Sequence, residues 1–575
     1  MELTRRGWLG ATAAGAAMAA SPALGDAPVS AAGTMRVFPA RFSIVAPGSG
    51  GHDYRPALEA LAAYAVAELN AVGLPGMTLS VTDAEGFTAV LALGWSDVAT
   101  HTPMRADSLF QIGSISKSFL ALTVLSLADA GMIDVDAPIT AYLPEAPWPA
   151  APITASQLMA HTAGLADGPG MFPRTPGGRL WTGFTPGSKF SYSNTGFELL
   201  GATVERLTGM SHAAAILQRV RAPLGVADIA GTIDQANRGR FPAAYWTYDT
   251  SLAADLPGGA LAPAKWDPED TSAGSIAATS EMMARYLRGL LKVARDGGGI
   301  LSPAMGRRFA TGVIASDADF GPGSHYAQGV AVQPVDGLPC LHHTGGMVAF
   351  SSSFHADPAA GVAAFASVNA RIGGYRPRQT TAYAIQLLRA VRAKTPLPLA
   401  PDPLQRYRIK APERLYGRFV GPEGSVFTLG SGEDFPRYSG PDGIAPLRLA
   451  DGQLVLPFGP HALDPVSEDG AVVGFWRGQT LYGRDAAHSQ PAAPERLRAL
   501  AGLYINRDPW VGFAEVFARG ETLYAPGVGV IIERGGYWSA EKDTGGVERL
   551  RFDGMLNGLA TRLNVSGVDF LRLKV

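Results

Sequence analysis

The stretch Gln111-Ile112-Gly113-Ser114-Ile115-Ser116-Lys117-Ser118-Phe119 decides how the rest of this chain is interpreted. It opens an apolar run, residues 119–130, in which hydrophobic residues recur at helical spacing. We therefore expect Ser114 and Lys117 in the first turn of a buried helix, where residues three apart share a face and the Lys117 amine can reach the Ser114 hydroxyl. A serine nucleophile activated by lysine needs this geometry. On its own, S-x-x-K is a weak signal, because a chain of this length contains about one by chance.

The composition is that of a folded globular protein. Apolar residues make up 47% of the 575 residues, charged residues 17%, and the net charge is -2. These values predict neither a nucleic-acid-binding surface nor a polybasic membrane patch. The length predicts about three or four domains. Cys340 is the only cysteine, so no disulfide can form within the chain and stability must come from the core.

The N-terminal sequence predicts export. Thr4-Arg5-Arg6-Gly7-Trp8-Leu9 is followed by an Ala/Gly-rich run, residues 10–20, and then by small residues at 21–25. Paired arginines, a weakly apolar segment and small residues at a cleavage site are typical of a twin-arginine signal. A membrane anchor is the alternative, but the apolar run is short and rich in alanine. We expect residues 1–27 to be the signal, and the mature protein to be periplasmic or secreted without a stable membrane span.

Residues 28–394 predict an α+β domain. A lead-in at 33–54 is followed by an amphipathic helix at 58–69 and a β-hairpin formed by 77–81 and 87–93. Helical patterns then dominate, including a short helix at 154–161 with Thr154 as N-cap, in which His161 has a structural role. The later segments are helices at 275–293, 299–309 and 377–394, and strands at 327–332, 348–354 and 361–369. Early and late strands separated by helices predict one antiparallel sheet assembled from both ends of the domain.

The sequence pattern changes after residue 394. Residues 395–412 contain five prolines and predict a stiff linker. Beyond them short alternating runs are separated by regular turn signals, which is typical of small barrels or sandwiches. Ala411-Pro412-Glu413-Arg414-Leu415 returns as Ala493-Pro494-Glu495-Arg496-Leu497. This repeat predicts two related all-β domains, residues 413–490 and 491–575.

Three motifs carry the chemistry: Ser114-x-x-Lys117, Tyr192-Ser193-Asn194 and His343-Thr344-Gly345-Gly346. Their order, wide spacing and placement at a helix start, a loop and a strand make chance an unsatisfactory explanation. Together they resemble the penicillin-recognising serine hydrolases, specifically the class C β-lactamase-related branch with its DD-peptidases, D-aminopeptidases and esterases. The resemblance covers roughly residues 50–392. It implies a β-lactamase/transpeptidase-like antiparallel sheet flanked by helices, followed here by the two all-β domains.

The chemistry can also be stated from the residues. A serine hydroxyl is a weak nucleophile and needs a neighbour that takes its proton. Free lysine and tyrosine side chains lose their protons only near pH 10, so each needs an environment that favours the deprotonated form. Placed together, the Lys117 cation would favour the Tyr192 phenolate, whereas burial would favour neutral Lys117. The sequence leaves open which of the two is the base.

The resemblance assigns the remaining roles. It implies that Tyr192 shuttles protons and that Asn194 binds the substrate amide, while the strand carrying His343 and Thr344 lines the opposite wall. The backbone N–H groups of Ser114 and Gly346 would form the oxyanion hole, and Gly345 would let the substrate approach closely. An acyl-enzyme on Ser114 would then be hydrolysed by water. No metal or other cofactor is required.

Position 343 is an informative departure, because many β-lactamases carry a lysine there. Histidine is mostly neutral at pH 7, so we expect weaker anchoring of a substrate carboxylate and less efficient β-lactam hydrolysis. The resemblance implies that a histidine here is usual in DD-peptidases, D-aminopeptidases and several amidases, and that paired β-barrel domains after the hydrolase domain are a feature of the D-aminopeptidases. We therefore expect a serine hydrolase acting on small peptide or amide substrates that contain D-amino acids.

Other interpretations stay in view. The same scaffold could host an esterase acting on small esters or a weak class C-like β-lactamase, and a non-enzymatic alternative is a penicillin- or cell-wall-binding protein with an idle site. Cys340 near His342 could suggest a cysteine hydrolase, but a buried strand thiol is the simpler reading. A zinc site at His342 and His343 lacks an H-E-x-x-H motif and clustered carboxylates. The sequence leaves the oligomeric state open.

Overall fold

The computed structural model describes the chain from residue 40 to residue 573 with several internal gaps. The described residues are 40–168, 173–175, 177–247, 261–372, 375–450, 452–456, 461–484, 490–508 and 511–573. The expected export signal at residues 1–27 lies outside them. Among the described residues, none of the helices combines the length and the hydropathy that a membrane span requires.

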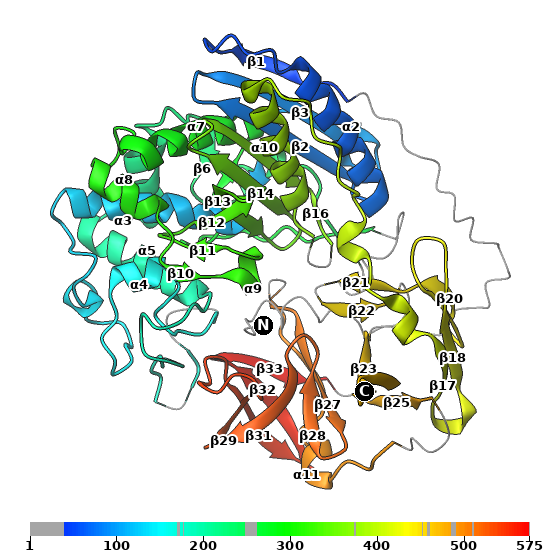
Figure 1. Cartoon of the computed structure of the whole chain (residues 1–575). Helices are drawn as coiled ribbons and strands as arrows, with labels where there is room; N and C mark the ends of the chain where they lie inside the picture. Colours follow the sequence, from blue (N-terminus) through cyan, green and yellow to red (C-terminus); the bar gives the residue numbers. More distant parts are fainter. Residues whose placement is uncertain are drawn as a thin grey trace.

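A large antiparallel sheet organises the first part of the chain (Figure 1). Its strand order is β1-β3-β2-β15-β14-β13-β12-β11-β10, with β4 paired to β3 at one side. The β2–β3 hairpin joins late strands through β2 and β15, where Met77 lies opposite Val368 and Asp83 opposite Val362. The expectation of one sheet assembled from both ends of the domain is therefore confirmed. The strands of this sheet are β1 (Ser43–Pro47), β2 (Gly76–Asp83), β3 (Phe87–Asp97), β4 (Thr102–Pro103), β10 (Ile314–Ala315), β11 (His325–Tyr326), β12 (Ala331–Val335), β13 (Leu338–Gly346), β14 (Ser351–Asp357) and β15 (Val362–Val368).

Helices cover both faces of the sheet because its central strands are apolar on both sides. In β15, Ala363 and Phe365 pack into the core that includes α3 and α7, whereas Ala364 and Ala366 pack into the core that includes α2 and α10. Successive strand residues point to opposite faces, so β15 separates the two cores. The helices are α2 (Arg55–Val72), α3 (Ser116–Asp129), α4 (Ala155–Met159), α5 (Asn194–Thr208), α6 (His212–Ile216), α7 (Ser280–Asp296), α8 (Pro303–Ala310), α9 (Asp317–Phe320) and α10 (Arg378–Ala393).

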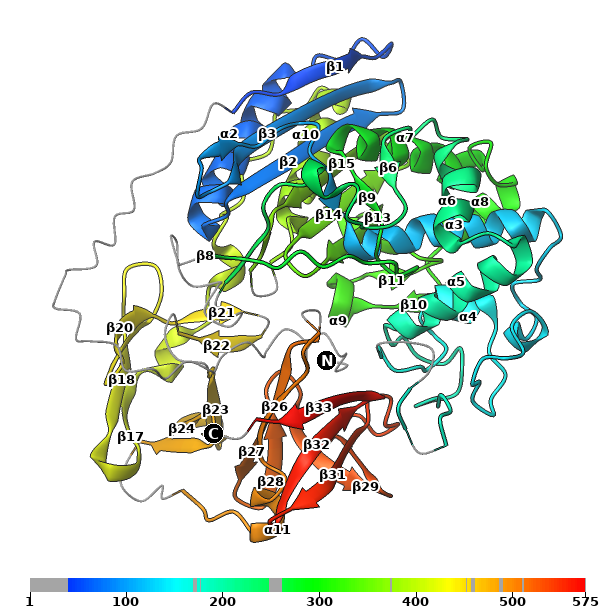
Figure 2. The same cartoon turned by 180° about the vertical axis from the view of Figure 1, so that it is seen from behind.

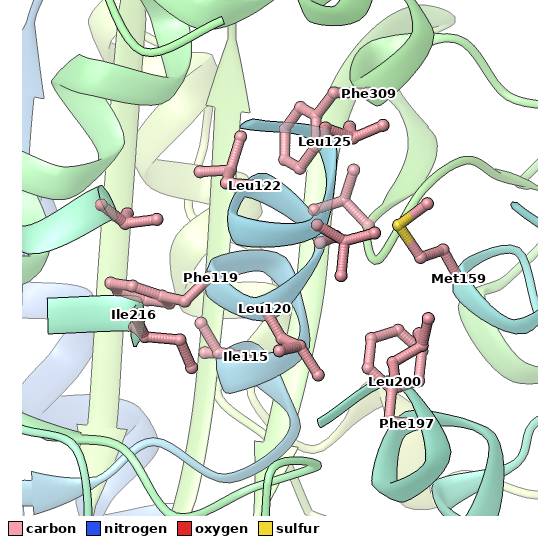
Figure 3. Close-up of a cluster of buried hydrophobic side chains, with 14 of the residues drawn as sticks. Ile115, Phe119, Leu120, Leu122, Leu125, Met159, Phe197, Leu200, Ile216 and Phe309 are labelled. Atoms are coloured by element: carbon pink, nitrogen blue, oxygen red, sulfur yellow. The ribbon is translucent and has the colours of Figure 1, made fainter. Parts of the chain in front are cut away.

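Helix α3 is buried on all sides, which is why its sequence is apolar around its whole circumference (Figure 3). Phe119 stacks on Tyr286 of α7 with 3.7 Å between ring centroids. Met159, Phe197 and Phe309 pack around it from α4, α5 and α8. Ser114 lies in the 3-10 turn η1 (Gly113–Ile115) directly before α3, so the nucleophile turn rests on a rigid helix.

Some expected boundaries are wrong. The lead-in at 33–54 contains strand β1, which pairs with β3. Helix α7 begins at Ser280 and not at 275, because Ala277 and Ala278 form strand β9 against β5, and Thr279 is the N-cap. The strand expected to carry His343 and Thr344 is β13, and it spans Leu338–Gly346. Strand β14 starts at 351 and not at 348, because residues 347–350 turn, with Met347 N bonded to Phe350 O. Strand β12 begins four residues later than the apolar pattern indicated.

Two small sheets and several short turns complete this part of the chain. One sheet has the order β5-β9-β6 and the other β16-β7-β8. The β5–β9 pair fixes the segment before the nucleophile turn, where Ile112 N also donates to Ile276 O at 3.0 Å. The elements are β5 (Phe110–Gln111), β6 (Ile229–Ala230), β7 (Tyr245–Thr247), β8 (Leu261–Pro263), β9 (Ala277–Ala278), β16 (Ala370–Arg371), η2 (Ile139–Ala141), η3 (Leu217–Arg221) and η4 (Arg238–Arg240).

The C-terminal part is all-β, as expected. Strands β17–β25 form one nine-stranded sheet, and β26–β33 form a closed barrel. Both lie on the same side of the hydrolase-like part, and the barrel approaches the region of α4 and α5 in both views (Figures 1 and 2). The elements between α10 and the barrel are η6 (Gln405–Tyr407), η7 (Pro412–Leu415), β17 (Gly417–Val420), η8 (Pro422–Gly424), β18 (Val426–Gly430), β19 (Arg437–Gly440), β20 (Gly443–Pro446), β21 (Arg448–Ala450), β22 (Gln453–Val455), β23 (Leu463–Glu468), β24 (Ala471–Arg477) and β25 (Thr480–Gly483).

The repeat seen in the sequence has a structural counterpart. Arg484 lies against Gly417 and its guanidinium is 4.9 Å from the Phe419 ring centre. In the barrel, Arg572 lies against Gly502 and is 5.0 Å from the Tyr504 ring centre. In each β-domain, the absence of a side chain on the glycine leaves space for an arginine from the C-terminal end of the same domain. The barrel elements are α11 (Glu495–Arg498), β26 (Gly502–Ile505), β27 (Phe513–Arg519), β28 (Thr522–Ala525), β29 (Gly529–Arg534), β30 (Tyr537–Ala540), β31 (Leu550–Leu556), β32 (Leu559–Val565) and β33 (Val568–Arg572).

Candidate active site

Lys117 lies at the centre of the candidate site. Its side chain is fully buried, and Nζ donates to Ser114 Oγ at 3.2 Å, to Asn194 Oδ1 at 2.6 Å and to the Ala273 carbonyl at 2.9 Å. Three oxygen atoms thus lie within hydrogen-bond distance of this nitrogen. Two of the three sequence motifs therefore meet at one nitrogen, and the amine is held beside the serine hydroxyl.

Tyr192 forms one wall around Lys117. It is almost fully buried, and Lys117 Nζ lies 5.0 Å from the centre of its ring. The ring also packs on His161, with centroids 4.1 Å apart, and His161 Nδ1 accepts a hydrogen bond from Ser193 N at 3.0 Å. His161 thus contacts both Tyr192 and Ser193 of the tyrosine motif, which fits the structural role expected for it.

Asn194 is oriented from two sides. Ser193 caps α5 by accepting from Gly196 N at 3.0 Å, which places Asn194 at the first position of the helix. Asp167 Oδ1 accepts from both the backbone N of Asn194 at 2.9 Å and its side-chain Nδ2 at 2.8 Å. The side-chain amide is therefore fixed with Oδ1 towards Lys117 and Nδ2 towards the acidic residue.

Strand β13 brings the third motif against the nucleophile turn. Gly113 has φ 58°, and a Cβ atom there would lie 2.5 Å from Gly346 N. A Cβ atom on Gly345 would lie 1.7 Å from the carbonyl oxygen of Ile112. Glycine at 345 is therefore required by the chain's own backbone, a reason different from the substrate approach that the sequence suggested. The Gly346 N–H lies next to the turn that carries Ser114.

His343 lies on β13, the strand that approaches the nucleophile turn. Its ring is fully buried, and Nδ1 is 2.6 Å from the Thr344 carbonyl while Nε2 is 2.9 Å from the Tyr326 hydroxyl. Because a carbonyl only accepts, Nδ1 carries a proton, and Nε2 is hydrogen-bonded to the tyrosine hydroxyl. Both ring nitrogens are thus engaged by the protein. A direct contact of His343 or Thr344 with substrate stays a prediction.

Two further side chains of this region were not found from the sequence. Glu198, on α5, accepts from Ala273 N at 3.2 Å and from the hydroxyl of Thr271, so it holds the turn whose carbonyl binds Lys117. It lies four residues after Asn194, and this helical spacing was the available signal. Arg376 lies against Gly346, where a Cβ atom would be 2.2 Å from its Nη2, and it donates to Ser351 Oγ at 3.2 Å. No local pattern marks Arg376.

The alternative chemistries fit this geometry less well. Burial raises the pKa of Cys340 to about 12, and Arg389 Nη2 contacts its sulfur at 3.1 Å. His342 stacks on His355 with centroids 4.1 Å apart, and its Nδ1 bonds the Phe354 carbonyl. Within the described ranges, no group of three or more His, Cys, Asp or Glu side chains is arranged to hold a metal ion.

Comparisons with known proteins point to one family. The Beta-lactamase family model matches residues 61–388, more than half of the chain. Esterase EstB of Burkholderia gladioli is 35% identical over 165 residues, 24% of this chain and 42% of the esterase. Penicillin-binding protein 4* of Bacillus subtilis (strain 168) is 28% identical over 151 residues, 24% of this chain and 33% of that protein. The chain thus spans less than half the length of these two curated relatives.

Two longer similarities agree. Penicillin-binding protein 4 of Amycolatopsis lactamdurans is 29% identical over 316 residues, 51% of this chain and 80% of that protein. The octameric penicillin-binding protein homologue from Pyrococcus abyssi superposes with a TM-score of 0.54 at 19% identity, covering 73% of this chain and 98% of that one, which shows a shared fold. Because the family model spans most of the sheet and all three motifs, this chain belongs to the beta-lactamase family of serine hydrolases.

Proposed function

We propose that this protein is a serine hydrolase that forms an acyl-enzyme on Ser114 and cleaves amide bonds in peptides containing D-amino acids, as D-aminopeptidases and DD-peptidases do. The observation that carries the proposal is the convergence on Lys117 Nζ, which touches the Ser114 hydroxyl at 3.2 Å and the Asn194 amide at 2.6 Å. A nucleophile, a candidate base and a substrate-orienting amide are thus held in one fixed arrangement.

The first half of the reaction follows from these contacts. Ser114 Oγ attacks the substrate carbonyl while its proton passes to Lys117 or Tyr192. The negative oxygen is stabilised by the N–H groups of Ser114 and Gly346. Asn194 Nδ2 uses one hydrogen on Asp167, and we assign the other to the substrate amide, which is the role that the family resemblance implies for Asn194.

The second half releases the products. The C–N bond breaks, and the amine leaves with the proton returned by the base, so the acyl group stays on Ser114. Water then attacks the ester in the same way, giving a carboxylic acid and restoring the serine. Every proton in this scheme moves between the substrate, water and residues of the site.

The substrate class rests on two features. His343 occupies the position of a lysine in many β-lactamases, and both of its ring nitrogens are engaged by the protein, so this position presents no lysine ammonium group to a β-lactam carboxylate. By resemblance, paired C-terminal β-domains like these two are a feature of the family's D-aminopeptidases. Both features favour small D-amino-acid amides over β-lactams.

An esterase is the second candidate, because the 35% identical relative is named an esterase. Ester cleavage would use the same acyl-enzyme, with an alcohol as leaving group. A weak class C-like β-lactamase and a penicillin- or cell-wall-binding protein with an idle site are the remaining alternatives. The intact set of Ser114, Lys117 and Tyr192 favours turnover over simple binding.

The test measures p-nitroaniline release from D-alanine and L-alanine p-nitroanilides, beside p-nitrophenyl acetate as an ester. We expect turnover of the D-amide that disappears in Ser114→Ala. Turnover of the ester alone would replace the peptide proposal by the esterase. If Ser114 is labelled by a fluorophosphonate but no substrate is turned over, the idle-site alternative gains support.

We also propose that residues 1–27 direct export to the periplasm or medium. The paired Arg5 and Arg6 before a weakly apolar run support this. Fractionation of cells producing the full chain tests it. Replacing both arginines by lysine should keep the protein in the cytoplasm, and export unaffected by the double substitution would contradict the proposal.

A further inference from the structure

The barrel presents a preorganised loop to the hydrolase domain. This barrel loop, residues 543–549, joins β30 to β31. The Asp543 carboxylate accepts from the backbone N of Gly546 at 2.9 Å, Val547 at 2.9 Å and Glu548 at 3.3 Å. Three main-chain bonds to one carboxylate hold the loop in a single shape, so its outer face is a defined surface.

That face fits closely against the hydrolase domain. Trp181 Nε1 donates to the Val547 carbonyl at 2.9 Å, and the Arg549 guanidinium lies 4.9 Å from the Trp181 ring centre. Gly183 meets Val547 so closely that a Cβ atom would be 2.2 Å from Val547 Cγ2. The fit is therefore one of shape as well as polarity.

A second barrel segment docks beside the first. At the β32–β33 turn, Asn564 Nδ2 donates to the Arg174 carbonyl at 2.8 Å, and Arg174 N donates to the Gly567 carbonyl at 3.1 Å. Gly168 lies close enough to the turn that a Cβ atom would be 3.2 Å from the Ser566 carbonyl. Two separate barrel turns thus contact described residues that precede the tyrosine motif: Gly168, Arg174, Trp181 and Gly183.

Glu548 connects this interface to the candidate site. Its side chain lies within the interface, with the residue 6% exposed, and Oε1 accepts from the backbone N of Asp167 at 2.7 Å. The other carboxylate oxygen accepts from the Ser566 hydroxyl. The Asp167 carboxylate in turn accepts from Asn194 N and Nδ2, and Asn194 Oδ1 contacts Lys117. Three consecutive contacts therefore run from the barrel to the lysine beside Ser114.

We propose that Glu548 is a positioning residue: it fixes the backbone of Asp167, so that the Asp167 carboxylate orients Asn194 and, through it, Lys117. The proposal rests on the proposed function in so far as Asn194 and Lys117 serve the reaction of Ser114. The C-terminal barrel then completes the hydrolytic site and is not an independent binding module.

Replacing Glu548 should change the structure only locally, around Asp167. Removing the Glu548 acceptor leaves the buried N–H of Asp167 without this partner, and the least costly relief is a shift of residues 166–168. The barrel core and the core around α3 are separate clusters, so neither loses apolar contacts. A shift of about 1 Å at a site-orienting residue lowers a rate by about 100-fold.

The test compares Glu548→Ala, Glu548→Gln and Glu533→Ala in the full-length protein. Glu533 is an exposed glutamate of the same barrel and serves as the matched control. We measure kcat and KM with p-nitrophenyl acetate and D-alanine p-nitroanilide, the rate at which a fluorophosphonate labels Ser114, and Tm. Glutamine keeps the acceptor for Asp167 N, so it distinguishes a lost hydrogen bond from a lost side chain.

We expect Glu548→Ala to lower kcat/KM by about 10- to 100-fold. With the ester the loss should fall on kcat, because this substrate has no amide for Asn194 to bind, whereas with the D-amide KM should rise as well. Glu548→Gln should stay within about threefold of wild type, and Glu533→Ala should match it. Wild-type kinetics in Glu548→Ala, or an equal loss in Glu548→Gln, would overturn the proposal.

Two provisions keep the test decisive. If Glu548→Ala does not fold, Ser566→Ala removes the second contact of the carboxylate and should give a smaller, about two- to fivefold, loss; an unchanged rate there overturns the proposal. Wild-type protein that cleaves the ester but not the D-amide would contradict the proposed substrate only, because the ester still reports on Glu548. If neither is cleaved, the labelling rate of Ser114 gives the same comparison.

Discussion

The hydroxyl of Tyr326 lies within hydrogen-bonding distance of Nε2 of His343, at 2.9 Å, while the opposite ring nitrogen donates to the Thr344 carbonyl. The position that carries a lysine in many β-lactamases is thus occupied here by a buried imidazole whose two nitrogens are both hydrogen-bonded. The surroundings of the ring include Phe320, whose ring centroid is 5.2 Å away. This environment is built for histidine and not for an ammonium group.

His343→Lys should therefore destabilise the protein without creating a β-lactamase. A lysine amine at this place would be buried beside a tyrosine and aromatic rings, at a cost of about 2–3 kcal/mol. Thermal unfolding and nitrocefin hydrolysis check this, with Tyr326→Phe as the control that removes one hydrogen bond for about 1 kcal/mol. Efficient nitrocefin turnover with unchanged Tm would show that the histidine alone decides the substrate.

Lys117→Met should abolish turnover while largely preserving the fold. Methionine fills a similar volume, but it donates to none of Ser114, Asn194 or the Ala273 carbonyl. We expect kcat with the best substrate to fall by about 100- to 10,000-fold, the range for loss of a general base. Lys292→Ala, an exposed lysine on α7, is the control and should keep full activity. Residual activity near wild type would remove Lys117 from the mechanism.

Gly345→Ala tests the close approach of β13 to the nucleophile turn. The new Cβ would meet the Ile112 carbonyl oxygen at 1.7 Å, so the strand and the turn must separate. We expect Tm to fall by several degrees and fluorophosphonate labelling of Ser114 to slow by at least tenfold, since overpacking costs about 1–3 kcal/mol. Gly239→Ala, where a Cβ meets nothing within 4 Å, should change neither quantity. Normal labelling of Gly345→Ala would mean that the site tolerates a wider gap.

The buried pair His342 and His355 predicts that the free energy of unfolding decreases at acid pH. Burial, together with the charges of Arg378 and Arg389, lowers the pKa of His355 from 6.5 to about 3. Between these values the unfolded chain binds a proton that the folded chain does not, so folding stability is complete above pH 6.5 and is lost progressively as the pH falls towards 3. Urea unfolding at pH 7 and at pH 4 measures the loss.

His355→Gln supplies the comparison for that measurement. Glutamine does not titrate, so the fall in unfolding free energy between pH 7 and pH 4 should become smaller. His325→Gln changes an exposed histidine and should leave the fall unchanged. An identical slope in His355→Gln would assign the decrease at acid pH to other groups, such as His342, whose pKa burial also lowers well below its usual value.

Much of the fold follows from local patterns. The β2–β3 hairpin, the helix with Gly209 as its C-cap and the capping box of Thr154 are all encoded by residues close in sequence. Two of the three motifs meet at Lys117, and β13 brings the third against the turn that carries Ser114. Such features are readable because periodicity, turn residues and caps act over a few positions.

Other features depend on contacts between distant segments, which leave no periodic signal. The helical pattern was expected to begin at residue 275. Ala277 and Ala278 instead pair with β5 as strand β9, so the helix begins only after them. The burial of His343 depends on Tyr326 from another strand. Asp167 and Glu548 are 381 positions apart, and neither lies in a recognisable motif. Residues that orient a site through the backbone are therefore the hardest to predict from sequence.

The contact between Asp167 and Glu548 also sets an order in time. During synthesis, Asp167 leaves the ribosome long before the barrel loop has been made, so the nascent hydrolase domain lacks this partner even when its own sheet has formed. If the contact positions Asn194 as we propose, Asn194 and Lys117 of a ribosome-bound chain are not yet correctly oriented beside Ser114 until the barrel folds. Folding of the last domain would then act as the maturation step of the first.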